Sequence, residues 1–577
     1  MRRDQPTEAP ASSPALAWGS DAMAEAIRGC AVPFLALTPG SSYRGLHDSI
    51  VNYLGNDQPA MLTCLHEEHA VAAAHGYAKV TGTPMAVALH SNVGLMHATM
   101  AIYNAYCDRV PMLILGATGP LDAPRRRPWI DWIHTSADQA ALVRPYTKWD
   151  DQPISVAASV ESIYRANALT RSYPCAPTYV CLDVSSQEAP LSEGFAVPGA
   201  SRFPPFPRPV AGPDQVIEVA NLLTSAKRPL LLVGRCGRDP AAWRNRVALA
   251  ERLGAAVLTD LKAGGMFPTR HRLHPAAPST FLSAEAKDLV RSSDLILALD
   301  WIDLGGTVRE AFGTDACPAK VIACTCDHAL TNGWAKDNFS LPVVDLAVGA
   351  HPDELVARLV TRLGDAPAGS IPGWPPPQAC RSASDSSAGD GQLGHLPADL
   401  AAALAETPHC LIRLPLAWSG EDLEVDDPLG YLGQDGGAGL GSGPGMAVGA
   451  ALALDGSGRL PVAVLGDGDF LMGATALWTA AHYRLPLLVV VANNGSYFND
   501  EVHQERMALT LGRPVANRWV GQHIREPVPD IASLARSLGL LGYGRVTTDN
   551  LRPTLRKAVA DVKDGNAVVV DVQVTTA

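Results

Sequence analysis

The chain has 577 residues, of which 47% are hydrophobic, and a formal net charge of −12. This length predicts about three domains, and the acidic balance argues against nucleic acid or an anionic membrane as a partner. The 11 cysteines follow no regular spacing, and no apolar run reaches the length of a spanning helix. We therefore expect a cytoplasmic protein with reduced thiols.

Residues 1–18 are rich in Pro, Ala and Ser and are predicted to be disordered. Apolar runs and helical segments then alternate, with strands expected in VPFLALTPGSS, MAVALHS, PMLILGATG and TYVCLDVSS and a helix expected from Glu67. Short continuous apolar runs between helices are typical of buried parallel strands. Residues 19–190 are thus predicted to form a doubly wound α/β domain.

Two further units of the same kind follow. After a Pro-rich segment, residues 208–365 contain the strand-like runs RPLLLV, AAVLTDL, DLILALD and KVIACTCD. Gly234-Arg235-Cys236-Gly237 matches a nucleotide-binding loop only in part, and we interpret it as a structural turn. Residues 366–395, rich in Gly, Ser and Pro, are predicted to be a flexible linker, and 396–577 a third α/β domain. The predicted fold class is three consecutive doubly wound parallel-sheet domains.

The stretch from 462 to 494 carries the clearest functional signal. It reads as an apolar run, a Gly-Asp-Gly turn, a helix from about Phe470 and a second apolar run that ends in Asn-Asn. Strand–helix–strand connectivity would place Asp467 and Asn494 at the carboxyl ends of neighbouring strands, the edge where open α/β sheets bind ligands. A carboxylate and an amide oxygen there suit Mg²⁺ or Ca²⁺.

Two glycines flank that carboxylate. Gly466 and Gly468 allow the main chain to approach a ligand closely, and the following helix offers free N–H groups to an anion. The stretch therefore predicts a site for a metal-bridged diphosphate. In contrast, the run from His66 to His69 lacks the histidine pair four residues apart that a zinc metalloprotease helix needs.

The GDG and NN elements at this spacing resemble the diphosphate motif of thiamine diphosphate enzymes. LHEEHAVAAAHGYAKVTG looks like the glutamate helix of the 2-oxo acid decarboxylase and acetolactate synthase superfamily. ALHSNVGLMHATMAIYNA, YTKW and MFPTRH are similar to segments of the benzoylformate decarboxylases within it. The resemblance implies a pyrimidine-binding domain, a central domain and a diphosphate-binding domain, with thiamine diphosphate and Mg²⁺ as cofactors.

The resemblance also implies roles for four catalytic residues. Glu67 would activate the cofactor through its pyrimidine ring, and Glu68 is the alternative if Glu67 is not the activator. His90 and His271 would transfer protons near neutral pH. Ser41 would contact the substrate carboxylate; a simple turn serine is an equally good interpretation.

For the cofactor, the resemblance implies a metal set of Asp467, Asn494 and the carbonyl of Ser496. The diphosphate contacts fall on the glycines of the GDG turn and on Tyr497. Asp469, an acidic residue beside a diphosphate, would contribute only its N–H group. In the family a large apolar side chain supports the bent cofactor. An ungapped match aligns that position with Ser442, and a match with a two-residue gap aligns it with Leu440. The sequence does not decide between the two.

The expected activity is decarboxylation of a 2-oxo acid, with carboligation as a side activity and without a flavin. The alternatives are an acetolactate synthase-like carboligase, a 2-hydroxyacyl-CoA lyase and a non-catalytic binding protein of the same fold. In the superfamily the pyrimidine domain of one subunit meets the diphosphate domain of another, so a homodimer is the expected minimal unit and a homotetramer the expected assembly. Asn499 and His503 are predicted to face the substrate and to favour substituents that form hydrogen bonds; the alternative is a surface helix whose polar residues face water.

Overall fold

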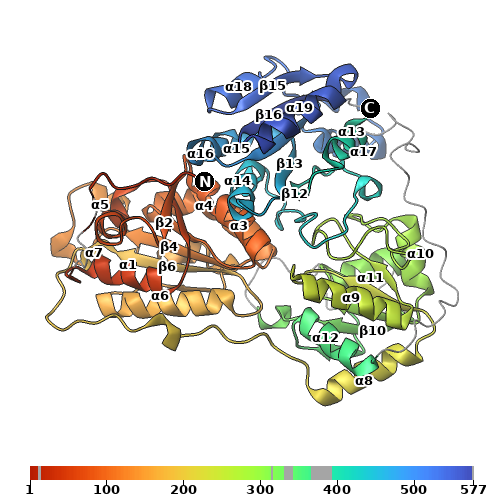
Figure 1. The fold of residues 1–577 in the computed structure, drawn as a ribbon, viewed down its shortest axis with the longest axis horizontal. Helices are drawn as coiled ribbons and strands as arrows, with labels where there is room; N and C mark the ends of the chain where they lie inside the picture. Colours follow the sequence, from red (N-terminus) through yellow and green to blue (C-terminus); the bar gives the residue numbers. More distant parts are fainter. Residues whose placement is uncertain (9, 11–14, 314–315, 331–341, 365–392, 575–577) are drawn as a thin grey trace.

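The computed structural model describes all residues except 9, 11–14, 314–315, 331–341, 365–392 and 575–577. Within the described residues the chain forms three parallel sheets, one after another, each covered by helices (Figure 1). The predicted fold class is therefore confirmed. The predicted linker at 366–395 lies, up to residue 392, outside the described residues.

The first sheet has the strand order β2-β1-β3-β4-β6-β5. Its strands are β1 (Phe34–Leu37), β2 (Ala60–Thr63), β3 (Ala86–Leu89), β4 (Met112–Thr118), β5 (Trp149–Asp151) and β6 (Pro177–Asp183). Its helices are α1 (Gly19–Gly29), α2 (Arg44–Asp48), α3 (Glu67–Thr81), α4 (Ser91–Cys107), α5 (Ile130–Ile133), α6 (Val156–Arg171) and α7 (Val184–Gln187).

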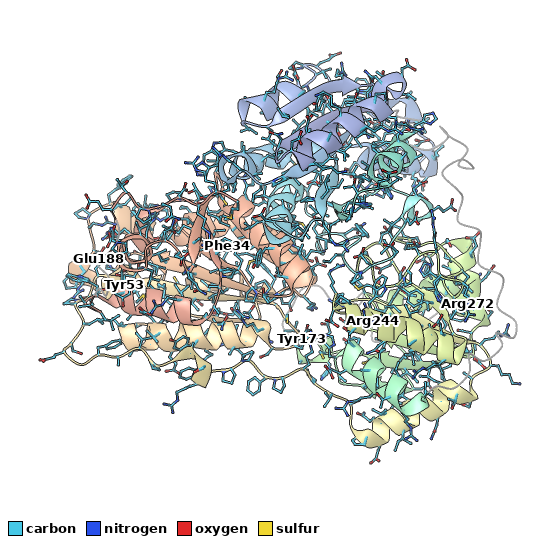
Figure 2. The ribbon with its side chains drawn as sticks, in the orientation of Figure 1. Phe34, Tyr53, Tyr173, Glu188, Arg244 and Arg272 are labelled. Atoms are coloured by element: carbon cyan, nitrogen blue, oxygen red, sulfur yellow. The ribbon has the colours of Figure 1, made fainter. Side chains whose placement is uncertain are left out.

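The second sheet has the order β11-β10-β9-β7-β8. Its strands are β7 (Pro229–Val233), β8 (Ala256–Leu258), β9 (Leu295–Leu299), β10 (Lys320–Cys324) and β11 (Leu346–Val348). Its helices are α8 (Pro213–Ser225), α9 (Pro240–Leu253), α10 (Ala284–Ser292), α11 (Leu304–Phe312) and α12 (Pro352–Leu363). Tyr173, at the junction with the first unit, packs edge-on against His351 with ring centroids 4.3 Å apart (Figure 2).

The third sheet has the order β12-β13-β14-β16-β15. Its strands are β12 (His409–Arg413), β13 (Leu460–Gly466), β14 (Leu487–Asn493), β15 (Leu541–Val546) and β16 (Ala567–Gln573). Its helices are α13 (Leu396–Leu404), α14 (Ser442–Leu454), α15 (Asp467–Gly473), α16 (Leu477–Tyr483), α17 (Phe498–Thr510), α18 (Ile531–Ser537) and α19 (Leu551–Lys563).

The structure corrects two local predictions. The helix after the GDG turn begins at Asp467 rather than near Phe470, and a short 3-10 segment separates α15 from α16. The first residues of the segment predicted to be disordered have defined partners: the amino group of Met1 pairs with Asp455 at 3.0 Å, and the N–H of Arg2 donates to the carbonyl of Tyr483 at 2.9 Å. Residues 9 and 11–14 of that segment lie outside the described residues. The N terminus accordingly lies beside α14 and α16 (Figure 1).

A single apolar core joins the first and third units. It contains residues of β1, β3 and β4 from the first sheet, residues of β13 and β14 from the third, and the facing sides of α3 and α14. The two helices approach so closely that a Cβ built on Gly449 would lie 1.7 Å from the carbonyl oxygen of Ala73, and one on Gly76 would lie 2.1 Å from that of Met446. Glycine is thus required at this crossing for steric reasons.

Among the described residues, no helix combines the length and apolar character needed to cross a membrane.

We predict that Gly449→Ala lowers the stability of the α3–α14 contact. Forcing a methyl group into a filled core costs about 1–3 kcal/mol, so the thermal midpoint of the first unfolding transition should fall. The matched control is Gly212→Ala, because a Cβ at Gly212 meets nothing within 4 Å. An equal midpoint for both variants would contradict the steric explanation.

Candidate active site

The carboxyl ends of β13 and β14 form the centre of the candidate site. Gly466 of β13 pairs in parallel register with Ala492 of β14, so the loops after the two strands are neighbours. Asp467 accepts hydrogen bonds from the N–H of Gly468 at 3.1 Å and from the N–H of Gly495 at 2.8 Å. One carboxylate therefore bridges the two strand ends, as the strand–helix–strand pattern predicts.

The electrostatics of this edge fit a divalent cation. Asp467 is 3% exposed, and burial raises the pKa of its carboxyl group, while the main-chain N–H bonds lower it. These N–H groups carry no formal charge, so a bound cation would offset the cost of burying the carboxylate. The side-chain oxygen of Asn494 accepts from the N–H of Ser496 at 3.0 Å and lies in the same loop. Carboxylate and amide oxygens are ligands suited to Mg²⁺.

The GDG turn is packed against an aromatic ring. A Cβ built on Gly468 would lie 2.6 Å from Cε1 of Tyr497, so only glycine lets the ring lie over the turn. Gly466 has open space at the corresponding position. The buried hydroxyl of Ser496 donates to Glu501 of α17, which connects the loop to that helix.

The side chain of Asp469 is turned away from the edge. Its Oδ1 accepts from the N–H of Gly441 at 2.7 Å, and its Oδ2 accepts from Nε of Arg413 at 2.9 Å. Arg413 also pairs with the buried carboxylate of Asp435. The negative charge of Asp469 is thus matched inside the protein, which leaves its main-chain N–H as the group that a diphosphate could use.

Leu440 and Ser442, the two candidates for supporting a bent cofactor, differ in environment. Ser442 is 1% exposed, and its hydroxyl donates to Glu68 at 2.7 Å and accepts from Asn104 at 3.0 Å. Leu440 is 42% exposed and precedes Gly441, whose Cβ would lie 3.2 Å from Cβ of Met472. Of the two, only Leu440 has an apolar side chain free to meet a ligand.

Two adjacent glutamates open α3 and face different helices. Glu67 faces α4, where Nδ1 of His97 lies 3.0 Å from its Oε2. Glu68 faces α14, where it accepts the hydroxyl of Ser442, and burial raises the pKa of its carboxyl group. Glu67 itself is 8% exposed.

His90 follows β3 and caps α4, and its partner is Ser42 rather than Ser41. The N–H of Ser42 donates to Nδ1 of His90 at 3.3 Å, and the Ser42 hydroxyl contacts the same nitrogen at 2.9 Å. Because a main-chain N–H can only donate, the neutral ring carries its hydrogen on Nε2. Burial, and then the nearby His134, lowers the pKa of His90, whereas Glu67 raises it.

Ser41 and His271 have local partners. Ser41 is exposed, and its carbonyl accepts from Arg44 at 3.1 Å. In the second unit, Nε2 of His271 lies 3.2 Å from Oε1 of Glu251, and Nδ1 accepts the N–H of Leu273 at 3.2 Å. Their proposed contacts with substrate stay predictions.

The contacts of the loop after β7 support the interpretation of Gly234-Arg235-Cys236-Gly237 as a structural turn. A Cβ on Gly234 would lie 2.2 Å from the carbonyl oxygen of Asp300, so the glycine allows close approach to the end of β9. Arg235 pairs with Asp300 at 3.1 Å and with Asp327 at 2.5 Å. This ion-pair network lines a cavity of about 540 Å³ between the first and second units.

Sequence reasoning missed Ser42, His97 and Arg413. Ser42 lies in the same turn as Ser41, so the segment was identified and the residue was not. His97 is in the identified histidine segment, but nothing in the sequence links it to Glu67. Arg413 ends β12, a strand that was not predicted.

Three segments of the chain, one after another, match models of protein families. They are the N-terminal TPP binding domain of thiamine pyrophosphate enzymes over 17–142, their central domain over 216–331 and their C-terminal TPP binding domain over 416–572. The chain belongs to the thiamine diphosphate-dependent enzymes. Within that family it falls among the 2-oxo acid decarboxylases and acetolactate synthases, as the resemblance implies.

The similar proteins include both kinds of enzyme. "Probable 2-ketoarginine decarboxylase AruI" of Pseudomonas aeruginosa is 27% identical, with coverage of 89% of this chain and 86% of the relative. The acetolactate synthase large subunit of Corynebacterium glutamicum is 27% identical (87% and 79%), and the benzoylformate decarboxylase of P. aeruginosa is 25% identical (86% and 89%). The solved benzoylformate decarboxylase of Polynucleobacter necessarius has the same fold, with a TM-score of 0.77, 20% identity and coverage of 97% and 98%.

We predict that Arg413→Met destabilises the third unit, because it leaves Asp435 and Asp469 buried without their cation. Breaking a buried pair by removing one partner costs about 3–5 kcal/mol. The control is Arg165→Met, which breaks an ion pair whose side chains are 55% and 64% exposed and should cost about 1 kcal/mol at most. Thermal unfolding checks both; similar midpoints would show that the Arg413 cluster contributes little.

Proposed function

We propose that the chain is a thiamine diphosphate- and Mg²⁺-dependent lyase that decarboxylates a 2-oxo acid, with carboligation as a side activity. The observation that carries the proposal is the oxygen-rich edge at Asp467 and Asn494, in the unit that matches the C-terminal TPP binding domain. The benzoylformate decarboxylase-like histidine segment and the two decarboxylases among the relatives support decarboxylation.

In this proposal the edge holds the cofactor by its diphosphate. Asp467, Asn494 and the carbonyl of Ser496 would hold Mg²⁺. The glycines of the GDG turn would let the main chain approach the diphosphate, which the N–H of Asp469 would bind. Tyr497 covers the turn, and Leu440 supports the bent cofactor. When bound, thiamine diphosphate supplies the stabilisation of negative charge that allows a 2-oxo acid to lose carbon dioxide.

The first unit then supplies the proton chemistry. Glu67 would hydrogen-bond the pyrimidine ring and so activate the cofactor, while Glu68 is bound to Ser442. His90, neutral and with its hydrogen on Nε2, is suited to donate a hydrogen bond to a carboxylate, and the protonated ring would be the form that gives a proton to an intermediate. His271 of the second unit would share proton transfer, and Ser41 of the first unit would contact the substrate carboxylate.

The surface near Glu67 supports an assembly of at least two copies. Apolar side chains of α4, of α15 and of the loop before α14 are exposed; they include Val93 (37%), Met96 (55%), Met100 (38%), Leu440 (42%) and Met472 (58%). A second copy that covers this face would bring its diphosphate edge towards Glu67. A homodimer is thus the minimal active unit, and the family resemblance favours a homotetramer.

The second candidate function is an acetolactate synthase-like carboligase, favoured by the Corynebacterium relative. A 2-hydroxyacyl-CoA lyase and a non-catalytic binding protein are the remaining alternatives. Flavin absorbance in the purified protein and acetolactate formed from pyruvate would support the carboligase, and binding of coenzyme A would support the CoA lyase.

The test of the proposed function is release of carbon dioxide from a panel of 2-oxo acids, with thiamine diphosphate and Mg²⁺ added. The panel contains pyruvate, 2-ketoarginine, benzoylformate and a hydroxylated benzoylformate. We expect decarboxylation, with a higher kcat/KM for the hydroxylated than for the plain aromatic acid, because Asn499 and His503 of α17 are polar. Tight cofactor binding without turnover of any acid would favour the non-catalytic alternative.

We predict that Asp467→Ala weakens metal-dependent binding of thiamine diphosphate by at least about a hundredfold. Loss of a residue that only supports a metal ligand already lowers metal affinity about 10–100-fold, and Asp467 is proposed to be a direct ligand. Titration calorimetry with and without Mg²⁺ measures this. Asp549→Ala, which removes an exposed carboxylate of the same unit, controls for net charge. Unchanged affinity in the Asp467 variant would refute the metal assignment.

A further inference from the structure

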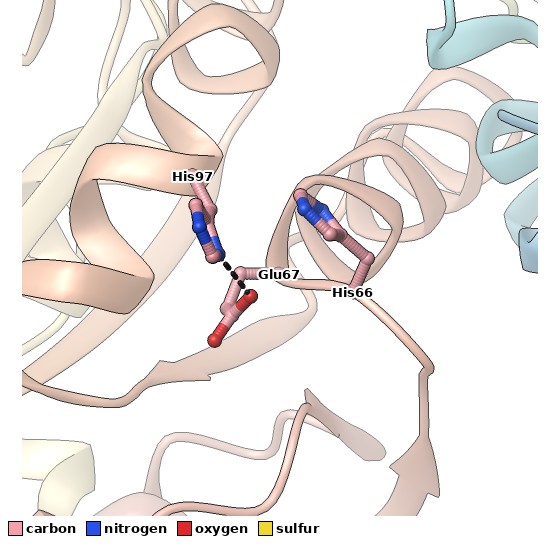
Figure 3. A group of neighbouring side chains, drawn as sticks. All are labelled: His66, Glu67 and His97. Atoms are coloured by element: carbon pink, nitrogen blue, oxygen red, sulfur yellow. Dashed lines mark hydrogen bonds and ion pairs between the residues drawn. The ribbon is translucent and has the colours of Figure 1, made fainter. Parts of the chain in front are cut away.

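Helix α4 presents two residues to Glu67, one turn apart. Nδ1 of His97 lies 3.0 Å from Oε2 of Glu67 (Figure 3). A Cβ built on Gly94 would lie 3.2 Å from both Cγ and Oε1 of the glutamate, so the absence of a side chain there makes room for the carboxylate. Since an ionised carboxylate can only accept, Nδ1 of His97 is the donor.

The ring of His97 is held in turn by His66. The two rings stack with centroids 4.8 Å apart and an interplanar angle of 23°. His66 is itself fixed, because its Nδ1 accepts the N–H of Glu68 at 3.1 Å as the cap of α3. Burial, and then the neighbouring His97, lowers the pKa of His66, whereas Glu67 raises it.

The same three side chains offer ligand atoms within 4.8 Å of one another, a set that could hold a metal ion. The cap contact argues against that use. With Nδ1 of His66 accepting an N–H, a metal on the other nitrogen would require an anionic ring, and the oxygen of Glu67 already has His97 as its partner. The geometry fits a hydrogen-bonded support better than a metal centre.

We infer that His97 is a positioning residue for Glu67: its Nδ1–H holds Oε2, which leaves Oε1 to meet the pyrimidine ring of the cofactor. This inference rests on the proposed function, in which Glu67 activates the cofactor. A carboxylate held by one charge-assisted hydrogen bond loses fewer orientations when it engages a second partner.

The test compares His97→Asn with His97→Phe. The amide nitrogen of asparagine occupies nearly the place of Nδ1 and keeps a donor, whereas phenylalanine keeps the stacked ring and loses the donor. We expect His97→Phe to slow proton exchange at C2 of bound thiamine diphosphate about tenfold to a hundredfold, the ratio expected for a lost hydrogen bond to a charged group. In His97→Asn the exchange rate should stay within about threefold of the wild-type rate, a smaller change than the loss of one hydrogen bond would cause. Cofactor affinity should be unchanged in both.

A packing role would give the opposite order, with phenylalanine tolerated and asparagine impaired, and that result would overturn the inference. Wild-type exchange in His97→Phe, with slow exchange in Glu67→Gln, would also overturn it and leave the proposed function intact. Wild-type exchange in Glu67→Gln would instead overturn the proposed role of Glu67 and, with it, the inference.

A second measurement needs no cofactor. Thermal unfolding of Glu67→Ala, His97→Phe and the double variant forms a double-mutant cycle. We expect the double variant to be less destabilised than the sum of the two single changes, since each removes the same hydrogen bond. Additive changes in the midpoint would show that the two side chains do not interact and would overturn the inference.

Discussion

The close crossing of α3 and α14 is the constraint on which both halves of the candidate site depend. It joins the first and third sheets through one core and leaves no space for a methyl group at Gly449 or Gly76. The same crossing brings the start of α3 against the start of α14, where Glu68 binds Ser442. A displacement of either helix would therefore move the glutamate pair and the loop before α14 together.

Charges buried around this crossing are each matched by a specific partner. Arg413 is held between Asp435 and Asp469, and Asp469 also accepts the N–H of Gly441, before the first turn of α14. The negative charge of Asp469 is thus compensated inside the protein by Arg413. Asp467 differs: its partners are uncharged N–H groups and burial raises the pKa of its carboxyl group, which is the expected environment of a carboxylate that a cation completes.

The sequence predicted the parts of the fold that a local pattern specifies. Continuous Val and Leu runs identified β13, β14 and β16, because strands buried on both faces have no polar alternation; the adjacency of Asp467 and Asn494 then followed from the crossover connection. The strands β5, β11, β12 and β15 were not predicted, since β5 and β11 are three residues long and β15 contains two glycines and an arginine. Arg413 and His97 were missed for a different reason: their roles depend on partners 56 and 30 residues away in the chain.

The environments of Glu67 and Glu68 show how helix geometry separates two adjacent identical residues. Successive side chains on an α-helix point about 100° apart, so two glutamates at the start of α3 cannot face the same neighbour. The cap of α3 at His66 fixes which of them faces α4 and which faces α14. Glu68 is then bound to Ser442, whereas Oε2 of Glu67 contacts His97 and its Oε1 lies beside Gly94. A one-residue shift in the start of the helix would put one glutamate in the place of the other, so the capping histidine helps to decide which glutamate faces α4.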